Sequence, residues 1–313
     1  METAPKIPLI ILAGSAKGGE TIEDEHSHRL YGPKGLKIRL AGRPLIDVVI
    51  ERFRSSGFFD PIFVAGPANR YGNTRGPATV IDTDADFGRN IKAALESVVA
   101  RLGVGPTAFT TCDVIPDGDE LARLMADYHD HLPLDFWFPL IRVPEDPGRL
   151  GAAAGKRQYR IIPDGESQPI SILPSHLVVV NPQALRFTLI YKSFQLAYRS
   201  RTRPVFTRFI YITSGVLFFL LLRDVRNLAR LKPPFLTPLV LFNAALLSHR
   251  LGRGGITQRQ VETHLHQIFG NEPHRRKYRD RTGRVPVGDA LSLALDIDTV
   301  EEAEEVAAEV SSS

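Results

Sequence analysis

The residues that could do chemistry first appear where an apolar run near the amino terminus ends in a loop of small residues and lysine. Residues 7–13 read IPLIILA, and Gly14, Ser15 and Lys17 follow, with Lys34 further along. Backbone N–H groups at the end of a strand, together with lysine ammonium groups, bind phosphate. The segment therefore predicts a nucleotide site, although a small-residue turn after a strand is also common in α/β proteins. Its glycine spacing excludes a Walker A loop and the dinucleotide-binding fingerprint.

A second candidate is Asp113, which follows the apolar run 108–112 and precedes the turn 114–116. An acidic residue at the carboxyl end of a parallel strand lies where open α/β sheets bind their ligands. A carboxylate there can hold Mg²⁺ that carries a triphosphate, so Mg²⁺ is the cofactor we expect. Turn initiation by aspartate is the alternative interpretation.

Two further aspartates, Asp296 and Asp298, stand near the end of the chain. We expect a strand over 290–297, and residues two apart on a strand share a face. One of the two carboxylates could then complete a metal site with Asp113. Capping of a helix expected over 299–310 is the alternative role of Asp298.

Strand-like and helix-like patterns alternate through the first 130 residues. Strands are expected over 7–13, 61–65, 79–81 and 108–112, and helices over 44–56, 88–102 and 119–129. Such alternation predicts an α/β fold with a doubly wound, mixed but mostly parallel sheet. Further strands, over 135–142, 159–162 and 176–180, would extend this sheet beside the nucleotide half.

A helical and unusually apolar pattern runs from about residue 185 to residue 266. We expect a single domain over 1–313 with a helical insertion over 186–270. Residues 186–253 contain twelve lysines and arginines but one acidic residue, Asp224, a local net charge of +11 in a chain whose formal charge is +4. This block is interpreted as a packed insertion, as helices on an anionic membrane surface, or as a span. The uncharged run 209–222 is shorter than the roughly 20 residues that a spanning helix needs.

Composition limits the class of protein. The chain has 313 residues, 43% of them hydrophobic, which is enough for a sizeable core. A single cysteine, Cys112, excludes an internal disulfide, and the start of the sequence lacks the pattern of a secretory signal. We therefore expect a cytoplasmic protein. The basic segment suggests, as an alternative, a peripheral position on the inner face of the membrane.

The order of these pieces resembles the MobA-like nucleotidyltransferases. The resemblance rests on LAG at 12–14, PK at 33–34, AGRPLI at 41–46, Asp113 with Pro116, VVNP at 179–182 and DIDT at 296–299. It spans residues 7–184 and 285–310. It implies a GT-A-type fold and an enzyme that joins an NTP to a phosphorylated or hydroxyl acceptor with release of pyrophosphate.

Carried over to this chain, the resemblance implies a role for each matching residue. Leu12, Ala13 and Gly14, with Ser15 and Lys17, would line the nucleotide. Lys34 would contact phosphate, and Asp113 would hold Mg²⁺ with Asp296 or Asp298. Phosphoryl-type transfer depends mainly on positioning and charge neutralisation, which lysines and a bound metal supply.

Four other polar residues are candidates. Asn90, at the start of the helix 88–102, could touch the base or the ribose, or simply begin the helix. Acceptor binding is expected of His176, Asn181 and Arg160, although an exposed basic strand is the alternative for Arg160.

The chain also departs from the family in the loop after the first strand. The family's loop reads GGxGxR, whereas residues 14–19 of this chain read GSAKGG. The basic side chain that the family's arginine supplies must therefore come from Lys17 or Arg29. A glycosyltransferase of the same fold that uses a nucleotide sugar is one alternative function. A catalytically inactive binding or membrane-associated module is another. No nucleic-acid partner is expected.

Overall fold

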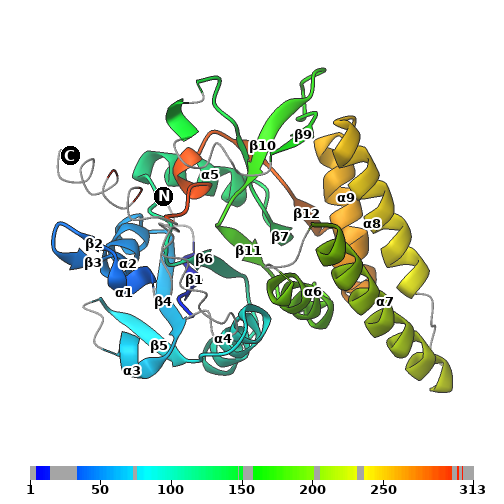
Figure 1. Cartoon of the computed structure of the whole chain (residues 1–313), viewed down its shortest axis with the longest axis horizontal. Helices are drawn as coiled ribbons and strands as arrows, with labels where there is room; N and C mark the ends of the chain where they lie inside the picture. Colours follow the sequence, from blue (N-terminus) through cyan, green and yellow to red (C-terminus); the bar gives the residue numbers. More distant parts are fainter. Residues whose placement is uncertain are drawn as a thin grey trace.

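A computed structural model describes residues 5–14, 34–72, 76–146, 148–150, 158–200, 205–230 and 236–297, together with 302 and 305. Its central sheet has seven strands in the spatial order β12-β7-β11-β6-β1-β4-β5 (Figure 1). The strands are β1 (Ile7–Leu12), β4 (Phe59–Gly66), β5 (Ala78–Asp82), β6 (Thr107–Thr111), β7 (Leu134–Trp137), β11 (Val178–Val180) and β12 (Thr282–Arg284). β11 runs antiparallel to both of its neighbours, and every other neighbouring pair is parallel. The predicted mixed, mostly parallel sheet is therefore confirmed.

Helices cover both faces of this sheet, which explains why β1 is an uninterrupted apolar run. Leu9 and Ile11 pack into the cluster that includes residues of α2 (Leu45–Ser55) and α5 (Gly118–Asp130). Ile10, between them, points to the other face and packs against α4 (Phe87–Leu102). All three side chains are fully buried, so β1 lies at the centre of the molecule.

A second sheet has the order β13-β8-β10-β9. Its strands are β8 (Leu140–Arg142), β9 (Tyr159–Ile161), β10 (Ile170–Pro174) and β13 (Val287–Gly288). The segment expected as one strand over 135–142 is two strands, β7 and β8, which belong to different sheets. Three short elements, β2 (Arg39–Leu40), β3 (Arg43–Pro44) and α1 (Lys34–Lys37), precede α2, and α3 (Ala68–Tyr71) follows β4.

The helical stretch forms a layer beside the sheet (Figure 1). It consists of α6 (Phe187–Arg199), α7 (Val205–Ala229), α8 (Leu236–Arg253), α9 (Gln258–Phe269) and α10 (Glu272–Lys277). α6 lies close to α4, since a Cβ at Gly88 would stand 2.5 Å from the Tyr191 carbonyl oxygen. Leu189, Leu220 and Leu236 join α6, α7 and α8 in one apolar cluster. Within the described residues, none of these helices combines the length and the apolarity needed to cross a membrane.

The expected strand over 290–297 is wrong. Residues 291–293 form a short 3-10 helix, η2 (Leu291–Leu293), and residues 295–297 follow without regular structure. Leu291, Leu293 and Ala294 all pack into the main core, which a strand with alternating faces could not achieve for consecutive residues. The argument that Asp296 and Asp298 share a strand face therefore fails. The helix expected over 299–310 lies outside the described residues, apart from 302 and 305.

Candidate functional site

The carboxyl ends of the parallel strands meet at one edge of the central sheet. Leu12 of β1 lies opposite Thr111 of β6. The ladder continues past both strands, because the Cys112 N–H donates to the Leu12 carbonyl (3.2 Å) and the Ala13 N–H to the Ala65 carbonyl (2.8 Å). Gly14 and Asp113 each stand two residues beyond this matched pair. The small-residue loop and the acidic residue, which are about 100 residues apart in sequence, therefore leave the sheet side by side.

Position 14 needs a glycine because the Asn90 side chain leaves no room there for a Cβ atom. A Cβ at Gly14 would stand 2.3 Å from the Asn90 Nδ2 atom, which is closer than any side-chain carbon can lie. The Asn90 amide is also held in place: its Oδ1 accepts from the Thr83 hydroxyl (2.7 Å) and the Ala85 N–H (2.9 Å), and its Nδ2 donates to the Ala85 carbonyl (3.1 Å). Asn90 is 5% exposed. The structure thus places Asn90 beside Gly14, with its side-chain amide held by residues 83 and 85.

The chain segment 290–297 lies against the residues that follow β6. The Ile297 N–H donates to the Asp113 carbonyl (3.0 Å), so the neighbouring Asp296 stands beside Asp113. The Ser292 hydroxyl accepts from the Asp117 N–H (2.9 Å), and the Ser292 N–H donates to Glu120 Oε2 (2.9 Å). Asp113 itself is partly buried, with a buried Oδ1. Two of the three predicted metal ligands are therefore neighbours in the fold.

His176 completes this group. It precedes β11, which runs antiparallel to β6, so it lies at the same edge as the end of β6. Its backbone N–H donates to the Leu293 carbonyl (2.8 Å), and its Nε2 lies 3.8 Å from Asp296 Oδ1. The structure thus gathers Gly14, Asn90, Asp113, His176 and Asp296 at one edge of the sheet.

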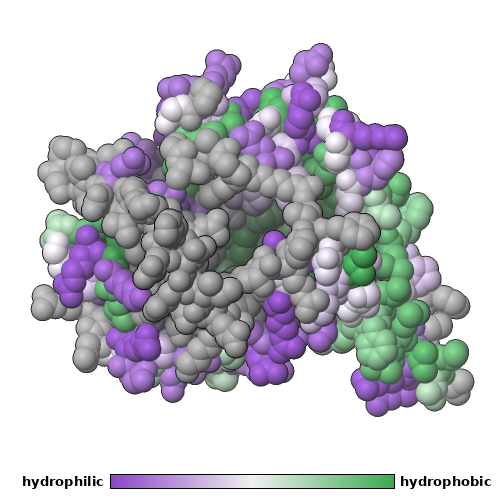
Figure 2. Space-filling model, in the orientation of Figure 1, coloured by the Kyte–Doolittle hydropathy of each residue, from purple (hydrophilic) through white to green (hydrophobic). Residues whose placement is uncertain are grey.

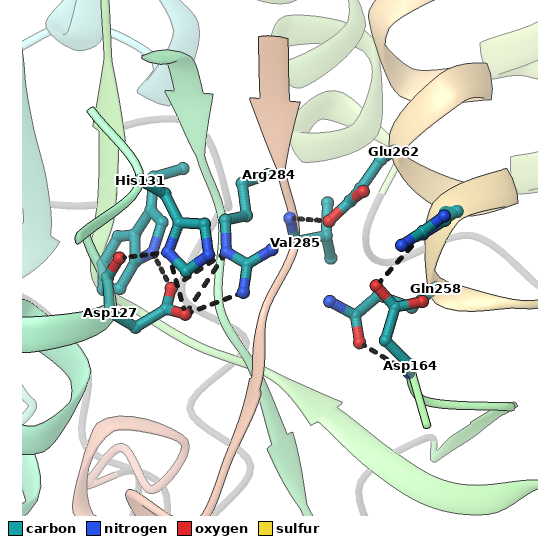
Figure 3. Close-up of polar contacts among 9 residues, drawn as sticks. Asp127, His131, Asp164, Gln258, Glu262, Arg284 and Val285 are labelled. Carbon is teal, nitrogen blue, oxygen red and sulfur yellow. Dashed lines mark hydrogen bonds and ion pairs between the residues drawn. The ribbon is translucent and has the colours of Figure 1, made fainter. Parts of the chain in front are cut away.

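The segment that delivers Asp296 is fixed by β12 (Figure 3). The Arg284 guanidinium contacts both carboxylate oxygens of Asp127 on α5, at 2.9 to 3.3 Å, and the Val285 N–H donates to Glu262 Oε1 on α9 (2.8 Å). Trp137 Nε1 donates to Asp127 as well (3.0 Å). β12 is thereby tied to a helix on either side before the chain reaches η2.

These anchors change the titration of two acids. Burial would raise the pKa of Asp127, but the hydrogen bonds from Arg284 and Trp137 outweigh it, so that this pKa is lowered. Burial dominates at Glu262 and raises its pKa, against the hydrogen bonds from Val285 and Gln258 and the charge of Arg284. Asp127 is therefore stabilised as a carboxylate, whereas the charge on Glu262 costs free energy.

Tyr71 is a residue that the sequence patterns did not single out. It is fully buried under the same edge, and a Cβ at Gly66 would stand 2.8 Å from its ring. Burial raises the pKa of Tyr71, and the charges of Cys112 and Asp113 raise it further. Its hydroxyl is thus held neutral close to Asp113. No periodic signal marks it, because it ends a four-residue helix in a stretch rich in glycine and proline.

The remaining predicted site residues are placed as follows. Leu12 and Ala13 lie at the end of β1, next to Gly14. Ser15, Lys17 and Asp298 lie outside the described residues, as does the side chain of Lys34. The backbone of α1 does reach the edge, since a Cβ at Gly35 would stand 3.4 Å from the Cβ of Cys112.

Asn181 and Arg160 lie away from the edge of the sheet where Gly14, Asp113 and Asp296 meet. Asn181 follows β11 at the opposite edge of the sheet, where its Oδ1 accepts from the Gln183 N–H (3.2 Å) and its own N–H donates to the Asp135 carbonyl (2.8 Å). Arg160 is an exposed residue of β9, the outer strand of the second sheet, and stands beside Gly254.

The donor set at this edge consists of carboxylate oxygens and one imidazole. Mg²⁺ binds proteins through one or two carboxylates and completes its shell with water and phosphate oxygens. Asp113 and Asp296 fit that requirement. Among the described residues, no group of three or more His, Cys, Asp or Glu is arranged to hold a metal by itself.

Comparisons with known proteins bear on the fold and on the domain over residues 9–152. Residues 9–152 match the family described as MobA-like NTP transferase domain. No curated protein is a significant match to the sequence. A hypothetical transferase from Thermus thermophilus has a TM-score of 0.53 and 19% identity, covering 96% of this chain and all of that one. This likeness shows the fold.

Two weaker structural similarities are to a CMP:2-keto-3-deoxy-manno-octonic acid synthetase complexed with CTP and to a 4-diphosphocytidyl-2C-methyl-D-erythritol synthase from Anaerococcus prevotii. The first has a TM-score of 0.47 and 12% identity, covering 98% of this chain and 99% of that one. The second has a TM-score of 0.45 and 9% identity, covering 98% of each chain. Residues 9–152 of the chain therefore carry a MobA-like NTP transferase domain.

Proposed function

We propose that this chain is a Mg²⁺-dependent nucleotidyltransferase, which joins an NTP to a phosphorylated or hydroxyl acceptor with release of pyrophosphate. The observation that supports this most directly is the convergence of Gly14, Asp113 and Asp296 at the carboxyl edge of the sheet. A metal-bound triphosphate needs two parts at one place. Backbone N–H groups of a loop bind its phosphate oxygens, and a pair of carboxylates binds its metal.

In the proposed reaction an oxygen of the acceptor attacks the α-phosphorus of the NTP. A P–O bond to the acceptor forms, the bond between the α-phosphorus and the bridging oxygen breaks, and pyrophosphate leaves with the bonding electrons. The backbone after β1 would hold the nucleotide, and Lys34 and Lys17 would neutralise phosphate charge. Because charge spreads over the phosphate oxygens in the transition state, fixed positive charge there accelerates the step.

The metal site that we propose uses Asp113 and Asp296, with Asp298 as the third candidate. Mg²⁺ bound there would neutralise phosphate charge and orient the triphosphate. His176, 3.8 Å from Asp296, lies where it could meet the acceptor. Asn181 and Arg160 stay as predicted acceptor contacts, but reaching the group would require the acceptor to extend across the sheet.

The experiment is a screen of single NTPs against sugar phosphates, polyol phosphates and molybdopterin-like acceptors, with pyrophosphate as the readout. A nucleotidyltransferase releases pyrophosphate, whereas a glycosyltransferase of the same fold releases a nucleoside diphosphate or monophosphate from a nucleotide sugar. Release of neither product with any pair would favour an inactive binding module.

We also propose an anionic membrane as the partner of the basic segment 186–253. Buried arginines are costly unless they are paired, and Asp224 is the one acidic residue of that segment. Several of its arginines must therefore face solvent or a polyanion. Contact of this kind would be peripheral.

A further inference from the structure

One flank of the helical layer exposes an unusual amount of apolar surface. Of the eleven exposed large apolar side chains among the described residues, seven lie on α7 and α8. Figure 2 shows the apolar surface gathered along the flank that these two helices form. The seven residues are Ile210, Phe218, Leu221, Leu222, Val225, Leu228 and Phe242. Contiguous apolar surface of this kind marks an interaction site.

The exposed residues of α7 share one side of the helix, which we call the α7 stripe: Ile210, Phe218, Leu221, Leu222, Val225 and Leu228. From Phe218 onward they recur every three or four residues, the spacing of neighbours on a helix face. Phe218, Val225 and Leu228 are more than 60% exposed. Leu220, in contrast, is fully buried and packs with Leu189 on the inner side. The stripe therefore faces away from the protein.

A row of arginines runs beside the α7 stripe. Arg223, Arg226 and Arg230 are exposed and spaced three and four residues apart, so they form a second line along the helix. Each of the first two directly follows a stripe residue in sequence, which places the two lines next to each other. The one acidic residue of α7 and α8, Asp224, is already engaged, since its Oδ2 accepts from the Thr237 N–H (2.9 Å).

This combination identifies the occupant. A helix with an apolar face bordered by arginines lies in the plane of a membrane, with the apolar face among the acyl chains and the cations on lipid phosphates. A second copy of the chain is a poorer fit. Isologous contact would bring the arginine rows of both copies into one interface, where no acidic residue of α7 or α8 is available to pair with them.

We infer that the α7–α8 flank is the surface that lies on the anionic membrane, with the α7 stripe and Phe242 inserted at the headgroup boundary and the arginine row on the lipid phosphates. This inference deepens the proposed membrane contact by assigning it to one surface. It does not depend on the identity of the nucleotide or of the acceptor, because the flank is separate from the edge that carries Asp113.

The test compares sedimentation of the full chain with phosphatidylcholine vesicles and with vesicles that also contain phosphatidylserine, at low and high salt. Phe218→Ser/Val225→Ser removes part of the stripe, and Arg223→Gln/Arg226→Gln removes part of the arginine row. Matched controls are Leu102→Ser/Leu132→Ser and Arg52→Gln/Arg54→Gln, which change exposed residues elsewhere. Each altered side chain is exposed, so folding should be retained, and circular dichroism checks this.

We expect binding only to the anionic vesicles and a loss at high salt. Both flank variants should partition about tenfold less, while both controls bind like the parent chain. A second readout reports insertion: Trp137, the only tryptophan of the sequence, is fully buried, so the emission of Phe218→Trp should shift to the blue on anionic vesicles.

Three outcomes overturn the inference, each in a different way. Binding to neither kind of vesicle rejects the proposed membrane contact as a whole. Anionic binding that both flank variants retain rejects this flank and leaves another surface of the basic segment. A dimer that dissociates in Phe218→Ser/Val225→Ser, with no vesicle binding, assigns the flank to a second copy. Pyrophosphate release without vesicles is measured in parallel and should be unchanged in the flank variants, which separates this test from that of the catalytic proposal.

Discussion

At the residue scale, the site depends on a few close approaches rather than on any one motif. Gly14 and Asp113 leave adjacent strands side by side, and the backbone hydrogen bond of Ile297 to Asp113 adds Asp296 to the pair. Asn90 is held beside Gly14 by three hydrogen bonds to the loop 83–85. Each contact predicts a distinct defect.

Replacing Asp113 with asparagine should remove most of the Mg²⁺-dependent turnover, because the amide is a weaker ligand that carries no charge. We expect a loss of about 100-fold to 1,000-fold in kcat, as for removal of other groups that stabilise transition-state charge. Pyrophosphate release measured over a range of Mg²⁺ concentrations checks this. Asp119→Asn on the nearby surface of α5 is the control. Turnover like that of the parent chain would refute the role of Asp113 as a ligand.

Lys34→Ala should lower kcat more than it weakens nucleotide binding, because a phosphate contact that strengthens in the transition state contributes mainly to the rate. Lys37→Ala, at an exposed position of the same helix, is the matched control. Steady-state kinetics and nucleotide titration separate the two effects. A rate constant equal to that of the control would rule out the role of Lys34.

Gly14→Ala should reduce both stability and nucleotide binding, because its Cβ would stand 2.3 Å from Asn90 Nδ2. We expect about 1–3 kcal/mol of destabilisation, the usual cost of overpacking. Asn90→Ala gives the new methyl group room, so the double variant should lose less than the sum of the two single variants. Urea denaturation of all four proteins measures this coupling, and strict additivity would contradict it.

At the scale of elements, β12 and the segment after it bring the end of the chain to the site. Arg284 ties β12 to α5 through Asp127, and Glu262 ties Val285 to α9 (Figure 3). The segment 290–297 then lies against the turn after β6. This arrangement makes the position of Asp296 depend on helices that are distant in sequence.

The raised pKa of Glu262 predicts how stability changes with pH. The folded state binds a proton at this carboxyl more tightly than the unfolded chain, so the free energy of unfolding falls as pH rises from the ordinary pKa of glutamate through the raised value. Glu262→Gln keeps an oxygen for the Val285 N–H but cannot ionise. The variant should match the parent chain at acidic pH and exceed its stability above that window.

Urea denaturation followed by the fluorescence of buried Trp137, at a series of pH values, measures this difference. Glu96→Gln, which alters an exposed residue of α4, is the control and should show a constant offset. Parallel pH curves for Glu262→Gln and the parent chain would contradict the assignment.

At the scale of the whole molecule, the sheet edge that holds the site and the α7–α8 flank are separate surfaces. The sheet is tied to the helical layer through α4, α6 and α9, so ligand binding at the edge should stabilise the folded chain as a unit. This permits a test that needs no acceptor.

The correct NTP together with Mg²⁺ should raise the melting temperature. Ligand at 100 times its dissociation constant stabilises the folded state by about 2.7 kcal/mol. Chelation of the metal should remove most of the shift, as should Asp113→Asn. Differential scanning fluorimetry with each NTP, with and without EDTA, measures this. A shift that is equal in EDTA would argue against a metal-bound triphosphate.

The sequence by itself determined the α/β class, the mostly parallel sheet and the position of Asp113 at a strand end, because local periodicity and turn residues decide where strands and helices lie. It also located the helical, basic segment, since charge and composition are read directly. The positions of residues 12–14 and 113 were predictable because they end or closely follow apolar strands whose carboxyl ends meet at one edge of the sheet.

The tertiary structure alone decided which polar residues meet. The segment 290–297 is apolar enough to be read as a strand, yet its residues 291–293 form a 3-10 helix that places both Leu293 and the adjacent Ala294 in the main core. Asn181 and His176 look equally suited to an acceptor, but they flank β11 at its two ends, and the antiparallel direction of β11 puts His176 rather than Asn181 at the edge that carries Asp113. The α7 stripe became visible only when packing showed which side of that helix is covered. In each case, contacts between residues that are distant in sequence outweigh the local preference for a strand or a helix. No local sequence pattern encodes such contacts.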